Sequence, residues 1–412
     1  MKVLLLSQVF YPDVVASAQY LSDLGVGLSE AGHTVTVLCS SHGYDNPSIK
    51  FARNETWKGC SIRRVPVLGL GKRSKIRRVI TFGSFFVSAV ASLAWIPRQD
   101  VVVVVPPPPL LSVMAAIFVR LRGGRLLYWN MDLNPDEAIA AGWMKPDSLA
   151  ARILGAALRY SLRASSSIVV LDRFMKDRIV AKGIAEDKVH TVPVWSHDNM
   201  VCYDAEGRAA FRKQLGVENK FVVMYSGNHS PLHPLDTVLQ AAYRLRENPA
   251  IAFVFVGGGS EFARMKDFAQ EHNLSNIVCV PYQPLEQLAG SLSSADLQVV
   301  LLGDAFVGIV HPSKIYNMLA VGAPFLYIGP AESHITDLQQ HSEIAQMGRF
   351  VRHGDVDQVV GHITLLASDY ASGTFSRPGR PAALDEFSQA SLMPTMIELV
   401  EAAGNKQYRT DA

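Results

Sequence analysis

Short apolar runs alternate with helical spacings through the first two hundred residues. An apolar run at 2–8 predicts a strand, and alternating apolar residues at 34–39 predict another. Between them, leucines at helical spacing predict a helix over 18–31. Val101–Val105 is apolar at every position, which is typical of a strand covered on both faces. The same reasoning predicts strands at 126–129 and 167–171 and a helix at 148–163. This order predicts a parallel α/β layer.

A second series of similar size follows the polar segment 195–204, which we interpret as a linker. The pattern predicts strands at 221–225, 252–256, 277–280, 297–302 and 325–328, and helices at 235–246, 261–272, 285–292, 313–321 and 392–402. Two α/β series joined once predict two Rossmann-like domains that face a cleft, over 1–198 and 199–385, with 386–412 as a terminal helix and tail. Ligands are then expected beyond the carboxyl ends of strands, where helix N-termini favour anions.

Composition narrows the class of protein. Charged residues make up 18% of the 412 residues, below the roughly 25% usual for globular domains, which suits a protein that rests against something apolar. Lys and Arg number 39 against 37 Asp and Glu, so the net charge gives no argument for a nucleic-acid partner. The four cysteines form no CxxC motif, which indicates neither a disulfide framework nor a zinc site and favours a reducing compartment. Tyr11-Pro12-Asp13 interrupts the first apolar run too early for a signal peptide.

The charge is nevertheless uneven along the chain. Lys50–Arg78 contains ten basic residues and one acid, and Val79–Ile96 then carries no charge. Length alone permits a transmembrane span. The alternatives are a buried helix of the first domain, or a helix at the membrane surface with Lys72–Arg78 near acidic headgroups.

A glycine turn and one helix start are the main candidates for chemistry. Gly257-Gly258-Gly259 follows a predicted strand, so backbone can approach a ligand there, although a tight strand–helix turn explains it equally well. Further along, Gly308 permits a loop near a ligand, and Ser313 lies at a helix start. Lys314 opposes the helix dipole in the first turn, which is understandable if lysine and helix end address one phosphate. Asn317 lies one turn further on, where it can bind ligand hydroxyls.

These segments resemble the GT-B glycosyltransferases of family four, in particular bacterial polysaccharide enzymes of the colanic-acid and O-antigen type. The matching segments cover nearly the whole chain: Leu4–Pro12, Gly32–Val37, Asp132–Pro135, Ile168–Leu171, Ser226–Asn228, Phe253–Gly257, Tyr282–Pro284, Pro312–Asn317 and Ala320–Pro324.

The resemblance implies roles for individual residues. Gly227 and the loop Gly308–Ser313, which includes Ile309 and Val310, would surround the donor's phosphates and sugar. Pro281 and Tyr282 would lie along the nucleobase, and Asn317 would bind the ribose. The loop Asp13–Gln19 and Asp132 would hold the acceptor, and the last helix would cross back to the first domain. Lys314 would neutralise the leaving diphosphate, so a retaining hexosyl transfer would need no metal ion and no cofactor besides the nucleotide-sugar substrate.

Several positions depart from the family pattern. Asn317 and Ile309 stand where the family usually has a pair of glutamates, and Asn228 and His233 stand where it often has an arginine and a lysine. An asparagine can bind a hydroxyl, but without charge assistance. Lys314 would then hold much of the phosphate charge, with help from His311 or His229.

Three functions remain open. The first is a cytoplasmic glycosyltransferase, peripheral on the inner face of the plasma membrane, that transfers a sugar from a nucleotide sugar to a glycan or lipid-linked acceptor in bacterial surface polysaccharide or glycolipid synthesis. The second is a binding or regulatory protein whose donor site has decayed. The third is a sugar-nucleotide 2-epimerase, against which the basic segment and the missing acids argue.

Overall fold

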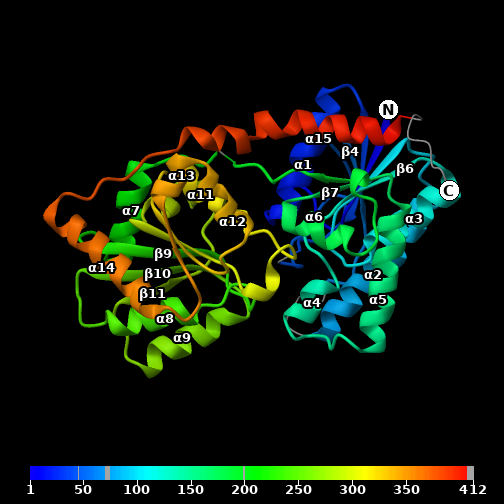
Figure 1. The fold of residues 1–412 in the computed structure, drawn as a ribbon. Helices are drawn as coiled ribbons and strands as arrows, with labels where there is room; N and C mark the ends of the chain where they lie inside the picture. Colours follow the sequence, from blue (N-terminus) through cyan, green and yellow to red (C-terminus); the bar gives the residue numbers. More distant parts are fainter. Residues whose placement is uncertain (45, 70–74, 198–199, 406–412) are drawn as a thin grey trace. The chain divides into compact units, whose positions relative to one another are not determined.

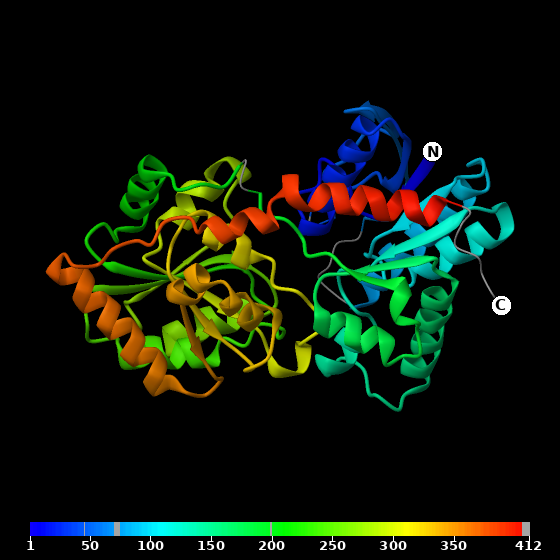
Figure 2. The same cartoon turned by 45° about the horizontal axis from the view of Figure 1, so that its top comes forward.

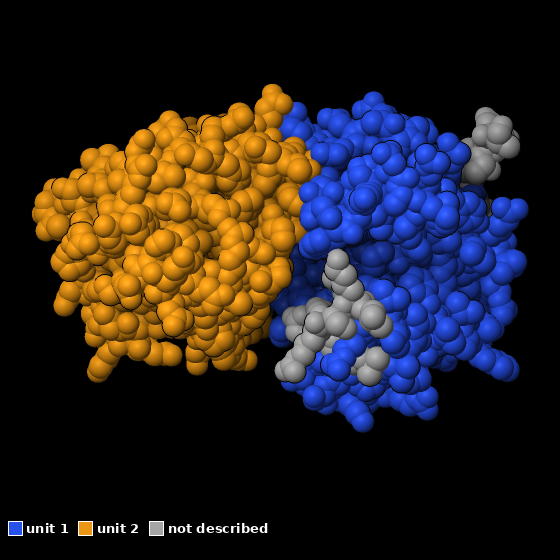
Figure 3. Space-filling model, turned by 90° about the horizontal axis from the view of Figure 1, so that it is seen from below, with its two compact units in different colours: residues 1–194, 308–310, 390–412 blue, residues 195–307, 311–389 orange. Residues whose placement is uncertain are grey.

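The computed structural model describes the chain except residues 45, 70–74, 198–199 and 406–412 (Figure 1). The chain forms two compact units, coloured separately in Figure 3. Unit 1 comprises residues 1–194, 308–310 and 390–412, and unit 2 comprises residues 195–307 and 311–389. The short segment 308–310 therefore belongs to unit 1, although it lies within the sequence of unit 2.

Unit 1 is built on an eight-stranded sheet with the order β3-β4-β2-β1-β5-β6-β7-β8. Its strands are β1 (Lys2–Leu6), β2 (Thr34–Ser40), β3 (Asn54–Trp57), β4 (Cys60–Val65), β5 (Val101–Val104), β6 (Arg125–Trp129), β7 (Ser167–Val170) and β8 (Val189–Thr191). All neighbours are parallel except β3 and β4, which form an antiparallel edge hairpin. The valines of β5 are completely buried, as their sequence predicted.

The helices of unit 1 are α1 (Ala16–Glu30), α2 (Lys75–Leu93), α3 (Leu111–Arg122), α4 (Asp136–Ala140), α5 (Leu149–Ala164), α6 (Arg173–Val180), the 3-10 turn η1 (Glu186–Lys188) and α15 (Gln389–Gly404). From Ala390 onward, α15 belongs to unit 1 and runs beside α1 (Figures 1 and 2). Gly27 of α1 leaves room for Met393 there, and His33 Nε2 lies 2.9 Å from Glu401 Oε1.

Helix α2 contains most of the uncharged segment 79–96 and has two different faces. Phe85, Ala89 and Leu93, at four-residue intervals, are buried against the unit. Val87 and Val90 on the other face are exposed. Within the described residues, no helix has both the length and the hydropathy needed to cross a bilayer. Of the preceding basic residues, Lys72 and Arg73 lie outside the described residues, as do the side chains of Lys75 and Arg78.

Unit 2 is built on a six-stranded parallel sheet with the order β11-β10-β9-β12-β13-β14. Its strands are β9 (Phe221–Asn228), β10 (Ile251–Gly258), β11 (Ile277–Val280), β12 (Leu297–Leu301), β13 (Phe325–Ile328) and β14 (Gly348–Val351). Its helices are α7 (Ala205–Leu215), α8 (Asp236–Arg244), α9 (Glu261–Glu271), α10 (Leu288–Ser293), α11 (Lys314–Ala320), α12 (His334–Asp337), α13 (Ser342–Met347) and α14 (Val356–Ser372). Its 3-10 turns are η2 (Leu285–Gln287), η3 (Asp304–Phe306), η4 (Leu338–Gln340) and η5 (Ala382–Phe387).

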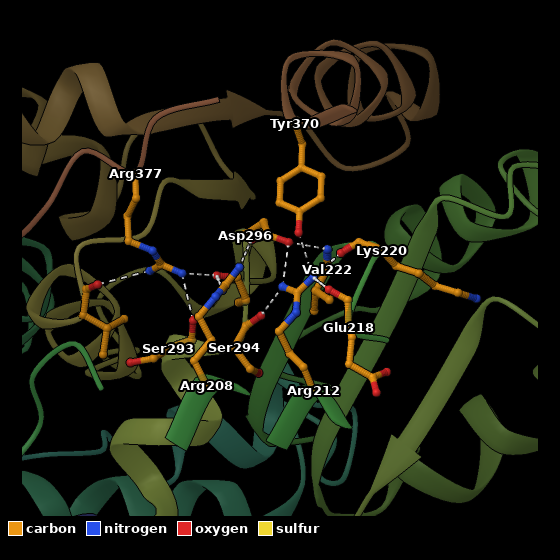
Figure 4. Close-up of polar contacts among 12 residues, drawn as sticks. Arg208, Arg212, Glu218, Lys220, Val222, Ser293, Ser294, Asp296, Tyr370 and Arg377 are labelled. Atoms are coloured by element: carbon orange, nitrogen blue, oxygen red, sulfur yellow. Dashed lines mark hydrogen bonds and ion pairs between the residues drawn. The ribbon is translucent and has the colours of Figure 1, made fainter. Parts of the chain in front are cut away.

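A buried carboxylate ties α7 to the sheet of unit 2 (Figure 4). Asp296, at the start of β12, accepts hydrogen bonds from Arg208, Arg212 and the backbone N–H of Val222, at 2.6, 2.9 and 2.8 Å. Arg377, on the segment after α14, donates to the backbone of the same region, at the carbonyls of Ser293, Ala295 and Val321. This charged cluster thus connects α7, the neighbouring strands β9 and β12, and the segment after α14.

Candidate functional site

The sheet of unit 2 changes direction at β9. Its sequence neighbour β10 pairs on one side and β12 on the other, so successive connections leave in opposite directions from this point. In open α/β sheets, ligands bind outside the carboxyl ends of the strands at such a switch point. Helix α11, which follows β12, brings Lys314 to the end of β9.

The Lys314 ammonium is buried beside β9 without a hydrogen-bond acceptor among the described residues. Its Nζ lies 3.9 Å from the centroid of the Tyr225 ring, in cation–π geometry. It also lies against Gly227, where an added Cβ would approach Nζ to 2.8 Å. Desolvation by burial lowers the pKa of Lys314 from 10.5 to about 7. Burying the charged ammonium therefore costs free energy, and no acceptor among the described residues offsets that cost, as one normally does for a structural lysine.

Two histidines pack around the same tyrosine. The ring centroids of His229 and His233 lie 4.9 and 6.5 Å from that of Tyr225. Desolvation, followed by the charge of Lys314, lowers the pKa of His229 to about 4 and of His233 to about 3. Both rings are therefore neutral at neutral pH. His233 Nδ1 lies 2.8 Å from the carbonyl of Leu301, and only an N–H can pair with a carbonyl, so its proton lies on Nδ1.

The glycines at the end of β10 have different neighbours: two pack against backbone and one faces a side chain. A Cβ on Gly257 would approach the Gly227 carbonyl to 2.1 Å, and one on Gly259 would approach the His229 carbonyl to 2.2 Å. These two glycines allow close packing of backbone on backbone, at φ values of 134° and 130°. Gly258 instead faces Tyr282, whose hydroxyl lies 3.4 Å from the Gly258 carbonyl. The tight-turn explanation of the glycine run therefore applies to Gly257 and Gly259.

The remaining predicted residues of unit 2 lie on either side of Lys314. Pro281 and Tyr282 are exposed after β11, and Asn228 ends β9, where its carbonyl accepts the Tyr225 hydroxyl at 2.8 Å. Ser313 occupies the N-cap position of α11 without a side-chain capping bond, and Asn317 is partly buried one turn later.

His311 joins a separate aromatic cluster of unit 2. Its ring stacks on His334 at 3.8 Å, and its Nε2 lies 3.0 Å from the Tyr316 hydroxyl.

The other predicted residues belong to unit 1. A Cβ on Gly308 would meet the Phe174 backbone at 2.5 Å, and the carbonyl of Ile309 accepts the N–H of Leu133 at 2.9 Å. Val310, the third residue of this segment, is buried. Asp132 follows β6 and is exposed. Desolvation first and the charge of Glu137 second raise the pKa of its carboxyl group, and contact of the exposed carboxylate with solvent reduces that increase.

The structure thus brings Lys314, Gly227 and His233 together around the end of β9. Sequence reasoning missed Tyr225, whose ring carries the ammonium, because an aromatic residue inside an apolar strand has the pattern of a core residue. A tyrosine two residues before a strand-end glycine was the only signal available.

Two family descriptions match the chain. The description "Glycosyl transferase 4-like domain" matches residues 16–195, and "Glycosyl transferases group 1" matches residues 207–328. The chain belongs to the glycosyltransferases. Among known proteins, it is 27% identical over 353 residues to Escherichia coli (strain K12) WcaI, whose name assigns it to colanic acid biosynthesis as a glycosyl transferase. That match covers 82% of this chain and 86% of WcaI.

Solved structures show the fold of this glycosyltransferase. Sucrose-phosphate synthase from Thermosynechococcus elongatus superposes with a TM-score of 0.75 at 17% identity, covering 98% of this chain and 99% of the synthase. Anabaena HepE, solved with UDP and glucose, superposes with a TM-score of 0.71 at 14% identity, covering 98% of this chain and all of HepE. The prediction of a GT-B fold with two Rossmann-like α/β domains is confirmed.

Proposed function

We propose that this glycosyltransferase transfers a hexosyl group, with retention and without a metal ion, from a nucleotide sugar to a glycan or lipid-linked acceptor of a bacterial surface polysaccharide or glycolipid. The observation that supports donor binding is the buried Lys314 ammonium, which has no acceptor among the residues that the structure describes and lies at the switch point of the sheet. A diphosphate would supply that acceptor. The likeness to WcaI over most of both chains supports the polysaccharide assignment.

The surroundings of Lys314 favour an anion. His229 and His233 are neutral, so Lys314 is the cation of this group, and a phosphate would gain a charge-assisted hydrogen bond from it. As the diphosphate leaves the sugar, negative charge develops on its oxygens, and a fixed ammonium in a water-poor site stabilises that charge strongly. The lysine therefore suits a leaving-group role.

The remaining donor contacts are proposed as the resemblance to the family-four glycosyltransferases implies them. We propose that Gly227, Asn228 and His233 surround the phosphates and that Gly257 and Gly258 bring the end of β10 close to the donor. Pro281 and Tyr282 would lie along the base, and Ser313 and Asn317 would bind donor hydroxyls. Gly308, Ile309 and Val310 would bind the donor sugar, with His311 and Asp132 assisting transfer.

UDP is expected to bind unit 2 and to take up protons as it binds. UDP is the nucleotide held by HepE, which makes it the natural probe. An anion beside the ammonium favours the charged form and returns the lysine pKa upward. Because the unliganded pKa is about 7, binding should take up about half a proton at pH 7 and about one at pH 8.5. Calorimetry in buffers of different ionisation enthalpy measures this uptake. Absence of any binding heat for nucleoside diphosphates would favour the decayed-site alternative.

We further propose that unit 1 associates peripherally with the cytoplasmic face of the plasma membrane through α2 and α3. Trp95, just after α2, is 84% exposed, and Leu121 of α3 is 77% exposed. Arg122 donates to the Ala94 carbonyl, which places the two helix ends side by side. Arg98 is exposed in the same region. Exposed apolar side chains beside arginines are typical of a surface that inserts at anionic headgroups.

Reversing the charges of Arg98, of Arg122 and of Arg77, an exposed arginine near the start of α2, is expected to release the protein from vesicles. Each basic residue near an anionic surface contributes about 1 kcal/mol, so Arg77→Glu, Arg98→Glu and Arg122→Glu together should weaken binding about 100-fold or more. Sedimentation with phosphatidylglycerol-containing vesicles measures this. The matched control is Lys213→Glu with Lys266→Glu and Arg352→Glu, three exposed basic residues of unit 2. Equal sedimentation of the triple variant and this control would contradict the proposed surface.

A further inference from the structure

The Tyr225 ring lies under the Lys314 ammonium, a place that no sequence pattern assigns to it. Side chains of a strand alternate between its two faces, so Phe221, Val223 and Tyr225 of β9 point to the same face of the sheet. All three are buried in one apolar cluster of unit 2. Phe221 contacts two other aromatic rings there, whereas the ring centroid of Tyr225 lies 3.9 Å from an ammonium. Tyr225 therefore differs from an ordinary core residue in having a charged neighbour.

The Tyr225 ring is fixed in orientation and stays uncharged. Its hydroxyl donates to the Asn228 carbonyl at 2.8 Å, which ties the ring to the end of β9. The His229 ring packs against it at 4.9 Å between centroids, with an angle of 77° between the two planes. Tyr225 is 1% exposed, and burial raises the pKa of its phenol well above its usual value. Lys314 thus faces a neutral ring of fixed geometry.

Gly227 encloses the end of the Lys314 side chain on a second side. An added Cβ at Gly227 would approach Nζ to 2.8 Å and Cε to 3.2 Å, so the glycine leaves the space that the lysine occupies. Nζ is buried and has no hydrogen-bond acceptor among the described residues. A phosphate oxygen can therefore contact Nζ only after the end of the side chain moves, which the flexible four-carbon stem of lysine allows. The position on Tyr225 is thus a resting position.

An aromatic residue suits this position because of the lysine charge. The face of an aromatic ring attracts an ammonium electrostatically and offers no such attraction to a neutral amine. Burial acts in the opposite direction and lowers the pKa of Lys314 to about 7. The neighbouring His229 and His233 are neutral and supply no negative charge. The ring therefore favours the charged lysine at a place where burial disfavours it, and an aliphatic side chain would not.

We propose that the Tyr225 ring holds the Lys314 ammonium charged and close to the end of β9 until a phosphate oxygen of the donor becomes its partner. Tyr225 is then a positioning residue, because it acts on the leaving diphosphate through Lys314. This role rests on the proposed transferase function, whereas the pairing of the ring with the ammonium does not.

NMR titration of Lys314 in the unliganded full chain tests the pairing. The lysines carry carbon-13 at Cε, and the Lys314 signal is the one that Lys314→Met removes. Tyr225→Leu should lower the titration midpoint of Lys314 by about one pH unit or more, because it removes a desolvated cation–π contact. Tyr225→Phe keeps the ring face and should keep the midpoint. Tyr225→Met, which fills more of the space without a ring, replaces the leucine variant if that variant does not fold.

Tyr327→Leu is the matched control for loss of a buried tyrosine. Tyr327 is also 1% exposed and lies in the same sheet, where its hydroxyl donates to Ser333 Oγ at 2.9 Å. Its replacement should lower stability and leave the Lys314 midpoint unchanged. A midpoint that Tyr225→Leu moves no more than Tyr225→Phe or Tyr327→Leu would mean that Tyr225 only fills the core, and the proposal would be overturned.

UDP binding tests the consequence for the donor. The affinity of Tyr225→Leu relative to Tyr225→Phe should fall about five- to tenfold between about pH 5.5 and pH 8, because the leucine variant loses the lysine charge at lower pH. The titration of UDP itself is common to both variants and cancels in this ratio. A ratio that does not change with pH would overturn the positioning role. A native chain that binds no UDP, with the NMR difference intact, would instead overturn the donor assignment and leave the ring–ammonium contact standing.

Discussion

Lys314→Ala is expected to lower kcat about 100- to 1,000-fold. The substitution removes the one cation that we assign to the leaving diphosphate, and loss of a single preorganised donor to developing negative charge costs about 2.7–4 kcal/mol. The Tyr225 ring and Gly227 would remain, so the site would keep its shape and lose its charge. The measurement is release of nucleoside diphosphate from the nucleotide sugar that a thermal-shift screen identifies.

Lys266→Ala is the matched control for this prediction. Lys266 is an exposed lysine of unit 2 whose Nζ lies 4.8 Å from the Phe262 ring centroid, so it shares the cation–π contact and lacks the burial. It should leave kcat unchanged. Near-normal turnover of Lys314→Ala would exclude the leaving-group role.

The burial of Lys314 should also make the stability of the folded chain depend on pH. A lysine whose folded pKa lies below its unfolded value binds fewer protons in the folded state between those two values. Stability of the native chain should therefore rise with pH from about 7 toward 10.5 through this group, and Lys314→Met should lack that rise. Below pH 7, Lys314→Met should be the more stable protein, because it buries no unpaired charge. A residue retained at such a cost is typical of a binding site.

Most of the parallel sheets could be predicted from apolar runs, because strands covered on both faces leave a simple signal. The predicted strands at 277–280 and 325–328 coincide with β11 and β13. The hairpin of β3 and β4 was not predicted. The hairpin lies at the edge of the sheet, where exposed residues such as Arg63 alternate with buried ones such as Ile62. The charged residues of β4 concealed this alternation of apolar and polar positions in the sequence. The segment 285–292 forms a 3-10 turn and a short helix instead of one helix.

The site was only partly predictable. Lys314 stood out because its charge opposes the helix dipole, which is a local property of the sequence. The burial of its ammonium on Tyr225 depends on how α11 packs against β9, and no spacing encodes that contact. Likewise, Gly257 and Gly259 were candidates for ligand approach, but what they approach is the backbone of the neighbouring strand end.

Asp296→Ala is expected to destabilise unit 2 by about 3–5 kcal/mol. Asp296 is 1% exposed and Arg212 is 3% exposed, so the substitution leaves the buried Arg212 guanidinium beside Arg208 without its carboxylate partner. It also removes the acceptor of the Val222 N–H (Figure 4). An intact buried ion pair adds little stability relative to apolar residues of the same size. Removing only one partner is far more destabilising, because the other charge then stays buried without a counter-charge. Urea unfolding followed by circular dichroism measures the loss.

The matched control for Asp296 is Asp357→Ala, which breaks the exposed ion pair of Asp357 with Arg244 in the same unit. The Asp357 side chain is 87% exposed, and pairs of this kind contribute at most about 1 kcal/mol. The two substitutions remove the same group from an arginine, so their difference isolates burial. A loss for Asp296→Ala no larger than for Asp357→Ala would mean that water reaches Arg212 once the carboxylate is gone. In that case the cluster would not be what connects α7 to the sheet.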